Sequence, residues 1–236
     1  MSRSIEENYH AVADIAESKG VKLLFKSESK LMKVISKLLF WMSDERFMDG
    51  FTTTLGRNIY LADRYTNMPE PSASETATIS HELVHVEQFE RNGNLWMSMQ
   101  YLFPQWLGLG AFLALGAIWG SLWWLMALIC LVFLAPVPAP WRMAHELEAY
   151  AVGYATWHWV QGKECPSLTQ EQVSKKLAGY VIQFTGWSYY KMWPFREDIE
   201  ARLTRKLIDL QLHDWGRLPL VAKEVYTATL GASKTS

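Results

Sequence analysis

The segment His81-Glu82-Leu83-Val84-His85 is the stretch from which both the fold and the chemistry of this chain can be argued. On an α-helix, residues four positions apart lie about 40° apart around the axis, so the two imidazoles can hold one metal ion. The glutamate beside the first histidine then faces the open side of the metal. This spacing is typical of zinc hydrolases, and we predict His81 and His85 as metal ligands and Glu82 as the catalytic residue.

The residues on both sides of this segment predict the helix that it needs. Ser72 and Glu75 have the spacing of a capping box, in which two side chains satisfy backbone N–H groups at a helix start. Asn92-Gly93 is a helix stop signal, so we predict a helix over residues 73–91. The alternative is an ordinary helix whose two histidines have no chemical role.

Composition narrows the class of protein. The chain has 236 residues, half of them hydrophobic, enough for one domain or for one domain with an insertion. Its net charge of -1 gives no electrostatic attraction for nucleic acid, so we expect no nucleic-acid partner. The two cysteines, Cys130 and Cys165, do not make a disulfide framework, which favours a reducing compartment.

The region before the HELVH segment predicts helices around a small sheet. Its first residues are polar and acidic, unlike a secretory signal, and capping residues predict a helix over 5–19 and then a short strand over 21–25. Apolar residues from Leu31 to Met42 recur at helical spacing opposite three lysines, which predicts an amphipathic helix ending near Ser43. Such a helix packs on a core or lies on a membrane surface.

Residues 51–62 have the pattern of a β-hairpin. β-Branched and aromatic residues flank the two-residue turn Gly56-Arg57, whose first position is glycine. The edge of this sheet either pairs with the backbone of an extended peptide or is purely structural.

Residues 92–141 contain no Asp, Glu, Lys, Arg or His, and residues 107–135 are almost continuously apolar. About 20 apolar residues suffice to span a bilayer. We therefore predict that this segment is embedded in a lipid membrane.

A catalytic zinc ion takes three protein ligands and a water molecule. No histidine follows His85 closely enough to complete a three-histidine set. Residues 142–153 (RMAHELEAYAVG) predict a second helix that carries two carboxylates, so a glutamate of this helix is the natural third ligand. Glu146 and Glu148 are both candidates, and His145 is a further possibility.

The HELVH segment, the apolar region and the RMAHELEAY segment together resemble the gluzincin metallopeptidases. The most similar group is the membrane one that includes the CAAX prenyl endopeptidases and the heat-shock membrane protease. This resemblance implies a Zn²⁺ cofactor and assigns Glu146 as the third ligand beside His81 and His85. Tyr150 departs from the family pattern, which usually has at that position an aspartate that orients a ligand histidine, so Glu148 stays an alternative ligand.

A shared zinc ion constrains the membrane topology. His85 and Glu146 must both reach one ion, so they lie on the same side of any membrane and the segment between them crosses it an even number of times. Residues 95–135 are just long enough for two crossings with a turn near residues 116–120, and a shallower re-entrant hairpin is equally compatible. Because basic residues are confined to the flanking regions, we expect those regions on the cytoplasmic face.

We therefore predict a mainly α fold with a small β-sheet (α+β), in which a zincin-like metallopeptidase domain is interrupted by a hydrophobic helical membrane hairpin. Its parts are residues 1–91 with the HExxH helix, 92–141 as the hairpin, and 142–236 with the third ligand. The predicted function is hydrolysis of peptide bonds in a peptide or protein substrate through a zinc-activated water. Candidates for stabilising the transition state are Tyr150, Tyr154 and His158.

Two other functions are compatible with the same sequence. One is a catalytically inactive zincin-like membrane protein that acts as a structural component of a larger assembly. The other is a membrane-active hairpin module in which HELVH has no role. The peptidase and the inactive zincin-like protein both require near one zinc per chain. Only the peptidase also requires turnover.

Overall fold

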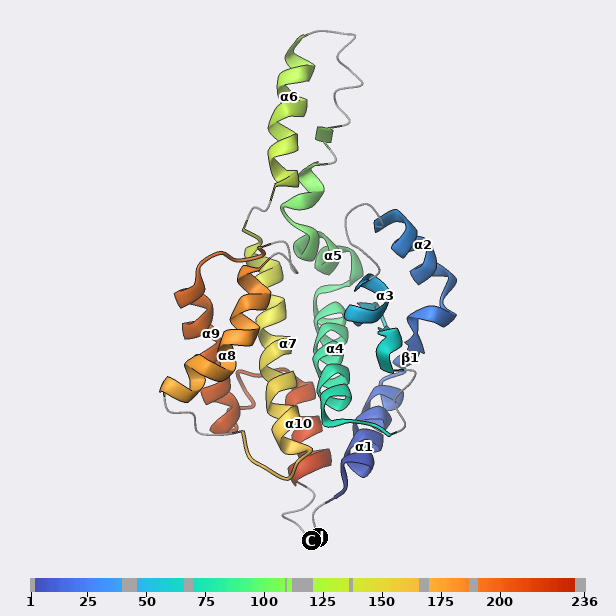
Figure 1. The fold of residues 1–236 in the computed structure, drawn as a ribbon, viewed down its shortest axis with the longest axis vertical. Coiled ribbons are helices and arrows are strands. Elements are labelled where there is room, and N and C mark those ends of the chain that lie inside the picture. Colours follow the sequence, from blue (N-terminus) through green and yellow to red (C-terminus); the bar gives the residue numbers. More distant parts are fainter. Residues whose placement is uncertain are drawn as a thin grey trace. The chain divides into compact units, whose positions relative to one another are not determined.

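The computed structural model describes residues 3–39, 46–65, 70–108, 110–111, 121–135, 138–165, 170–186 and 191–231. It is mostly helical with one small sheet, as the α+β prediction expects (Figure 1). The chain forms two compact units. The first comprises residues 1–91, 148–167 and 206–236, and the second comprises residues 92–147 and 168–205.

The first unit combines a three-stranded sheet with several helices. Along the chain its elements are α1 (Ile5–Ser18), β1 (Lys22–Phe25), η1 (Lys26–Glu28), α2 (Lys30–Leu39), α3 (Arg46–Gly50), β2 (Thr53–Leu55), β3 (Asn58–Leu61), η2 (Asp63–Tyr65) and α4 (Ala73–Asn92). It also contains the larger part of α7 (Pro140–Trp159), the end of α9 (Arg196–Gln211), α10 (Leu220–Tyr226) and η6 (Thr227–Gly231). The predicted end of the amphipathic helix near Ser43 lies outside the described residues.

The sheet has the strand order β1-β3-β2, with β1 parallel and β2 antiparallel to β3. Strands β2 and β3 are the predicted hairpin, in register at Thr54 and Ile59, and β1 is the predicted short strand. Gly56 in the hairpin turn has a φ of +60°, a conformation that glycine adopts without steric cost. Strand β2 is therefore at one edge of the sheet.

Helix α4 forms where its capping residues predict. The Ser72 hydroxyl accepts a hydrogen bond of 3.1 Å from the Glu75 backbone N–H, and Gly93 follows the helix with a φ of +80°. Ile79 and Leu83 are fully buried, as expected for the core-facing side of the helix. The sequence patterns at both ends and on the apolar face thus all specify the same helix.

Helices α4 and α7 run side by side in the first unit (Figure 1). A Cβ atom placed on Gly153 of α7 would lie 3.1 Å from the backbone oxygen of Ala77 and 3.4 Å from the Cβ of His81. The helices therefore approach each other at a position where any side chain would be crowded. This close contact fixes α7 opposite the first histidine of the HELVH segment.

The second unit contains α5 (Asn94–Leu102), α6 (Ser121–Leu131), η4 (Val132–Leu134), the start of α7, α8 (Gln170–Thr185) and most of α9. A Cβ on Gly110 would lie 2.5 Å from the Sγ of Cys130, so the chain after α5 passes directly against α6. Among the residues that the structure describes, no helix combines the length and the apolar character needed to cross a bilayer. The expected hairpin turn near residues 116–120 lies outside the described residues, and the two-crossing hairpin stays a prediction.

Candidate metal centre

His81 and His85 of α4 and Glu146 of α7 form a group that could hold a metal ion. Each residue offers one ligand atom, and these atoms all lie within 4.8 Å of one another. Glu146 and His85 are buried, and His81 is partly exposed. Two imidazoles and one carboxylate are the protein ligands of a catalytic zinc site with an open fourth position, so the donor set fits this metal.

Contacts along α4 and α7 position these ligands. The rings of His81 and His85 lie edge to face with their centroids 4.9 Å apart, and the ring of Tyr150 lies edge to face with His81 at 4.7 Å. Glu146 is one turn before Tyr150 on the same continuous helix. Tyr150 thus packs its ring against a candidate ligand.

The tautomer of His85 suits metal binding. Its Nδ1 atom lies 2.9 Å from the Oε1 atom of Gln88, and the Nε2 atom of Gln88 donates a hydrogen bond of 3.2 Å to Glu148. A carboxylate only accepts hydrogen bonds, so Glu148 binds the Nε2 end of the Gln88 amide. The Oε1 end of this amide then faces the His85 imidazole. Nδ1 then carries the proton, which leaves the lone pair of Nε2 for a metal ion.

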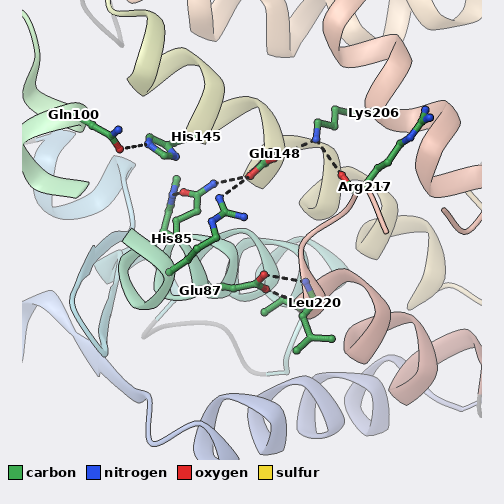
Figure 2. A network of polar contacts seen from close by, with 11 residues as sticks. His85, Glu87, Gln100, His145, Glu148, Lys206, Arg217 and Leu220 are labelled. Carbon is green, nitrogen blue, oxygen red and sulfur yellow. Dashed lines mark hydrogen bonds and ion pairs between the residues drawn. The ribbon is translucent and has the colours of Figure 1, made fainter. Parts of the chain in front are cut away.

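Glu148 is held in an ion-pair network (Figure 2). Its Oε1 atom accepts a hydrogen bond of 3.1 Å from Lys206 Nζ, and Arg91 lies 3.7 Å from Oε2. Lys206 also donates to the backbone oxygen of Arg217. The structure therefore groups Glu146 with the two histidines and gives Glu148, the alternative ligand, the different task of orienting Gln88.

His145, the least favoured ligand candidate, contacts α5. Its Nε2 atom lies 3.2 Å from Gln100 Oε1 within the second unit (Figure 2).

Tyr101 of α5 contacts two residues of α7. Its hydroxyl donates a hydrogen bond to Glu146 Oε1, and the Arg142 guanidinium lies 4.9 Å from the centroid of its ring. A residue of the uncharged region thus touches the candidate third ligand.

Glu82, the predicted catalytic residue, is buried, and its Oε2 atom accepts a hydrogen bond of 2.7 Å from the Thr54 hydroxyl. Thr54 belongs to the edge strand β2, so the sheet holds this carboxylate of α4. The hydroxyl donates and the carboxylate oxygen accepts, so this hydrogen bond fixes the orientation of the Glu82 side chain. Glu82 therefore has one carboxylate oxygen held by the sheet.

A buried lysine lies near Glu82. Lys26 is fully buried, donates a hydrogen bond of 2.7 Å from Nζ to the backbone oxygen of Phe47, and lies 3.7 Å from the centroid of the Phe47 ring. Burial lowers the pKa of Lys26 to about 8, although the carboxylates of Glu82 and Asp63 act in the opposite direction. This lysine was not identified in the sequence as part of the site.

The three candidates for transition-state stabilisation occupy successive turns of α7. Tyr150 contacts His81, whereas Tyr154 and His158 pack against each other with ring centroids 4.9 Å apart. At 1.5 Å rise per residue, Tyr154 lies about 12 Å and His158 about 18 Å along the helix from Glu146. Tyr150 is therefore the one of the three placed beside the ligand group.

Three residues that support the site have no role predicted from the sequence. Gln88 follows His85 by three positions, so helical spacing alone could have indicated its contact. Thr54 and Tyr101 reach the site from other elements, and their contacts depend on tertiary structure that no local pattern specifies.

Comparison with protein-family models, curated proteins and solved structures finds no significant match to this chain. A functional inference therefore rests on the sequence motifs and on the geometry of the site.

Proposed function

We propose that this chain is a zinc-dependent, membrane-associated metalloendopeptidase of the HExxH…E type. The observation that carries the proposal is the convergence of one ligand atom each from His81, His85 and Glu146, with the buried carboxylate of Glu82 one residue from the first ligand. The resemblance of the HELVH and RMAHELEAY segments to the membrane gluzincins supports the same activity.

Zinc bound to these ligands would polarise a peptide carbonyl and lower the pKa of a bound water. Glu82 takes the proton of the attacking water and returns it to the leaving amine. The Thr54 hydrogen bond occupies Oε2 of this carboxylate, so we assign proton transfer to Oε1. Gln88 and Glu148 keep the His85 imidazole in the tautomer that presents Nε2.

The membrane part of the proposal rests on the second unit. Residues 92–141 carry no charged side chain, and large apolar side chains of α5 and α6 are exposed. Monomeric soluble proteins rarely expose large contiguous apolar surfaces. A lipid environment would remove this surface from water.

Zinc content and turnover together test the proposal. We expect near one zinc per chain in the purified protein and in Glu82→Gln, and loss of zinc in Glu146→Gln. Glu197→Gln, which changes an exposed carboxylate at the start of α9, is the matched control and should keep both zinc and activity. On a library of quenched fluorogenic peptides, Glu82→Gln should lose at least about 100-fold in turnover, the contribution typical of a general base.

The outcomes separate the possible functions. Equal turnover by Glu82→Gln and the wild type would refute the catalytic assignment. A wild-type protein that binds zinc but cleaves no peptide in the library would instead be a zincin-like structural protein. Zinc retained at full stoichiometry by Glu146→Gln would refute the ligand set.

A further inference from the structure

Helix α5 has one face that contacts the start of α7. The four contacts are Tyr101 with Glu146, Gln100 with His145, the Tyr101 ring with Arg142, and Phe103 with Trp141 at 4.7 Å between ring centroids. All of these residues belong to the second unit. Gln100 and Tyr101 of α5 thus face the helix that carries the candidate third ligand.

The other face of α5 is apolar and exposed. Leu95 is 77% exposed, and Trp96 and Leu102 are each 55% exposed. Leu102 lies seven positions after Leu95, which places these two side chains along one side of the helix. Helix α5 therefore buries Met97 but leaves these three large apolar side chains exposed.

Helix α6 also exposes large apolar side chains. They are Trp124, Leu125, Met126, Leu128, Ile129 and Leu131. Protein interfaces normally have a polar rim, whereas residues 92–141 contain no charged side chain at all. Exposed tryptophans such as Trp96 and Trp106 favour the boundary between lipid and water, so a lipid bilayer is the occupant that fits this surface.

We propose that α5 couples lipid binding to the metal centre, with Tyr101 as the positioning residue for Glu146. This inference rests on the proposed zinc site but not on peptide hydrolysis. Helix α5 has nine residues, and a helix of this length is marginally stable in water without packing partners. Lipid contact on the outer face stabilises the helix, and the stable helix holds the Tyr101 hydroxyl against Glu146.

The consequence is a zinc site that is tightest when α5 is in contact with lipid. Residues that orient metal ligands typically contribute 10- to 100-fold to metal affinity. We therefore expect phosphatidylcholine vesicles to lower the zinc dissociation constant of the full-length protein. We expect Tyr101→Phe to raise that constant about 10- to 100-fold in the presence of vesicles.

Competition with a fluorescent zinc chelator, with and without vesicles, measures these effects. Tyr226→Phe is the matched control, because Tyr226 also donates to a glutamate, Glu164, but far along the chain from the metal centre. It should leave the zinc affinity and its response to vesicles unchanged. In Tyr101→Phe, the dissociation constant should no longer respond to vesicles, and the visible spectrum of the Co²⁺-substituted protein should differ from that of the wild type.

A second pair of variants tests the outer face. Leu95→Glu with Leu102→Glu should abolish the effect of vesicles, whereas Leu212→Glu, at a residue 73% exposed outside this surface, should not. An unchanged wild-type zinc affinity on adding vesicles, or a Tyr101→Phe response equal to that of the wild type, overturns the coupling. If the wild-type protein binds zinc neither with nor without vesicles, the metal site is refuted as well. Vesicle-dependent zinc affinity without peptide cleavage would refute only the peptidase.

Discussion

Substituting Gly153 by alanine tests the close approach of α4 and α7 on which the metal centre depends. The added Cβ would lie 3.1 Å from the backbone oxygen of Ala77 and 3.4 Å from the Cβ of His81. A backbone oxygen within a helix cannot rotate away as the end of a side chain can. The two helices must therefore separate by a few tenths of an ångström, and the displacement reaches His81 directly.

Gly179 in α8 provides the matched control, because a Cβ added there meets no atom within 4 Å. Replacing a glycine by alanine within an exposed helix stabilises it by about 1 kcal/mol. Crowding in a packed interior costs about 1–3 kcal/mol and opposes this gain at Gly153. We therefore expect Gly179→Ala to be more stable than the wild type, and Gly153→Ala to be less stable than Gly179→Ala by about 1–3 kcal/mol.

Urea unfolding followed by circular dichroism, with zinc removed by a chelator, measures the stability difference. Chelator competition on the folded proteins measures zinc affinity, which we expect Gly153→Ala to reduce about tenfold, at the low end of the effect of residues that support metal ligands. Gly179→Ala should leave zinc affinity unchanged. If both alanine variants gain the same stability and bind zinc as the wild type does, the close contact between α4 and α7 is not present.

Three further predictions concern the surroundings of the site. Glu148→Gln should weaken zinc binding about tenfold, less than Glu146→Gln, because it releases Gln88 without removing a ligand; the reverse ranking in a competition titration would make Glu148 the ligand. Thr54→Val should lower kcat by roughly 10- to 100-fold at unchanged zinc content, since a hydrogen bond to a charged group contributes about 1.5–3 kcal/mol; an unchanged kcat would remove Thr54 from the mechanism. In the wild type the free energy of unfolding should rise with pH between 8 and 10.5, and Lys26→Met should reduce this rise; urea unfolding across this pH range measures it.

The sign of the Lys26 effect follows from its lowered pKa. Between about 8 and 10.5 the unfolded chain binds the proton that the folded protein releases, so stability rises with pH over this window. The lowering of the pKa from 10.5 to about 8 means that burying the protonated, fully buried side chain costs about 3 kcal/mol of stability. This cost is fully present below pH 8. A wild-type protein whose unfolding free energy has the same pH dependence as that of Lys26→Met would contradict the assignment.

The elements that local sequence specifies were predicted correctly. The Ser72 cap and the Asn92-Gly93 stop bound helix α4, and Gly56 marks the turn of the β2–β3 hairpin, because these signals act on neighbouring backbone groups. The pairing of the two histidines with Glu146 came from helical spacing joined to a family resemblance. Local patterns determine where helices begin and end and which face they bury.

Contacts between distant segments could not be predicted from the sequence. Glu148 and Glu146 are equally plausible ligands by type and spacing, and only the positions of Gln88 and Lys206 show which task Glu148 performs. The Tyr101 hydroxyl lies within a strongly apolar stretch, where nothing in the sequence indicates a polar partner 45 residues further on. Such contacts depend on how helices pack, and a single sequence has no periodic signal for them.

The first unit is assembled from three separate stretches of chain, residues 1–91, 148–167 and 206–236. During synthesis the HELVH helix leaves the ribosome before either of the later stretches exists. Glu148 then follows, and its partner Lys206 comes another 58 residues later. The support that orients His85 is therefore completed late in translation, so we expect zinc to be acquired after residue 206 has emerged and not by the nascent HELVH helix.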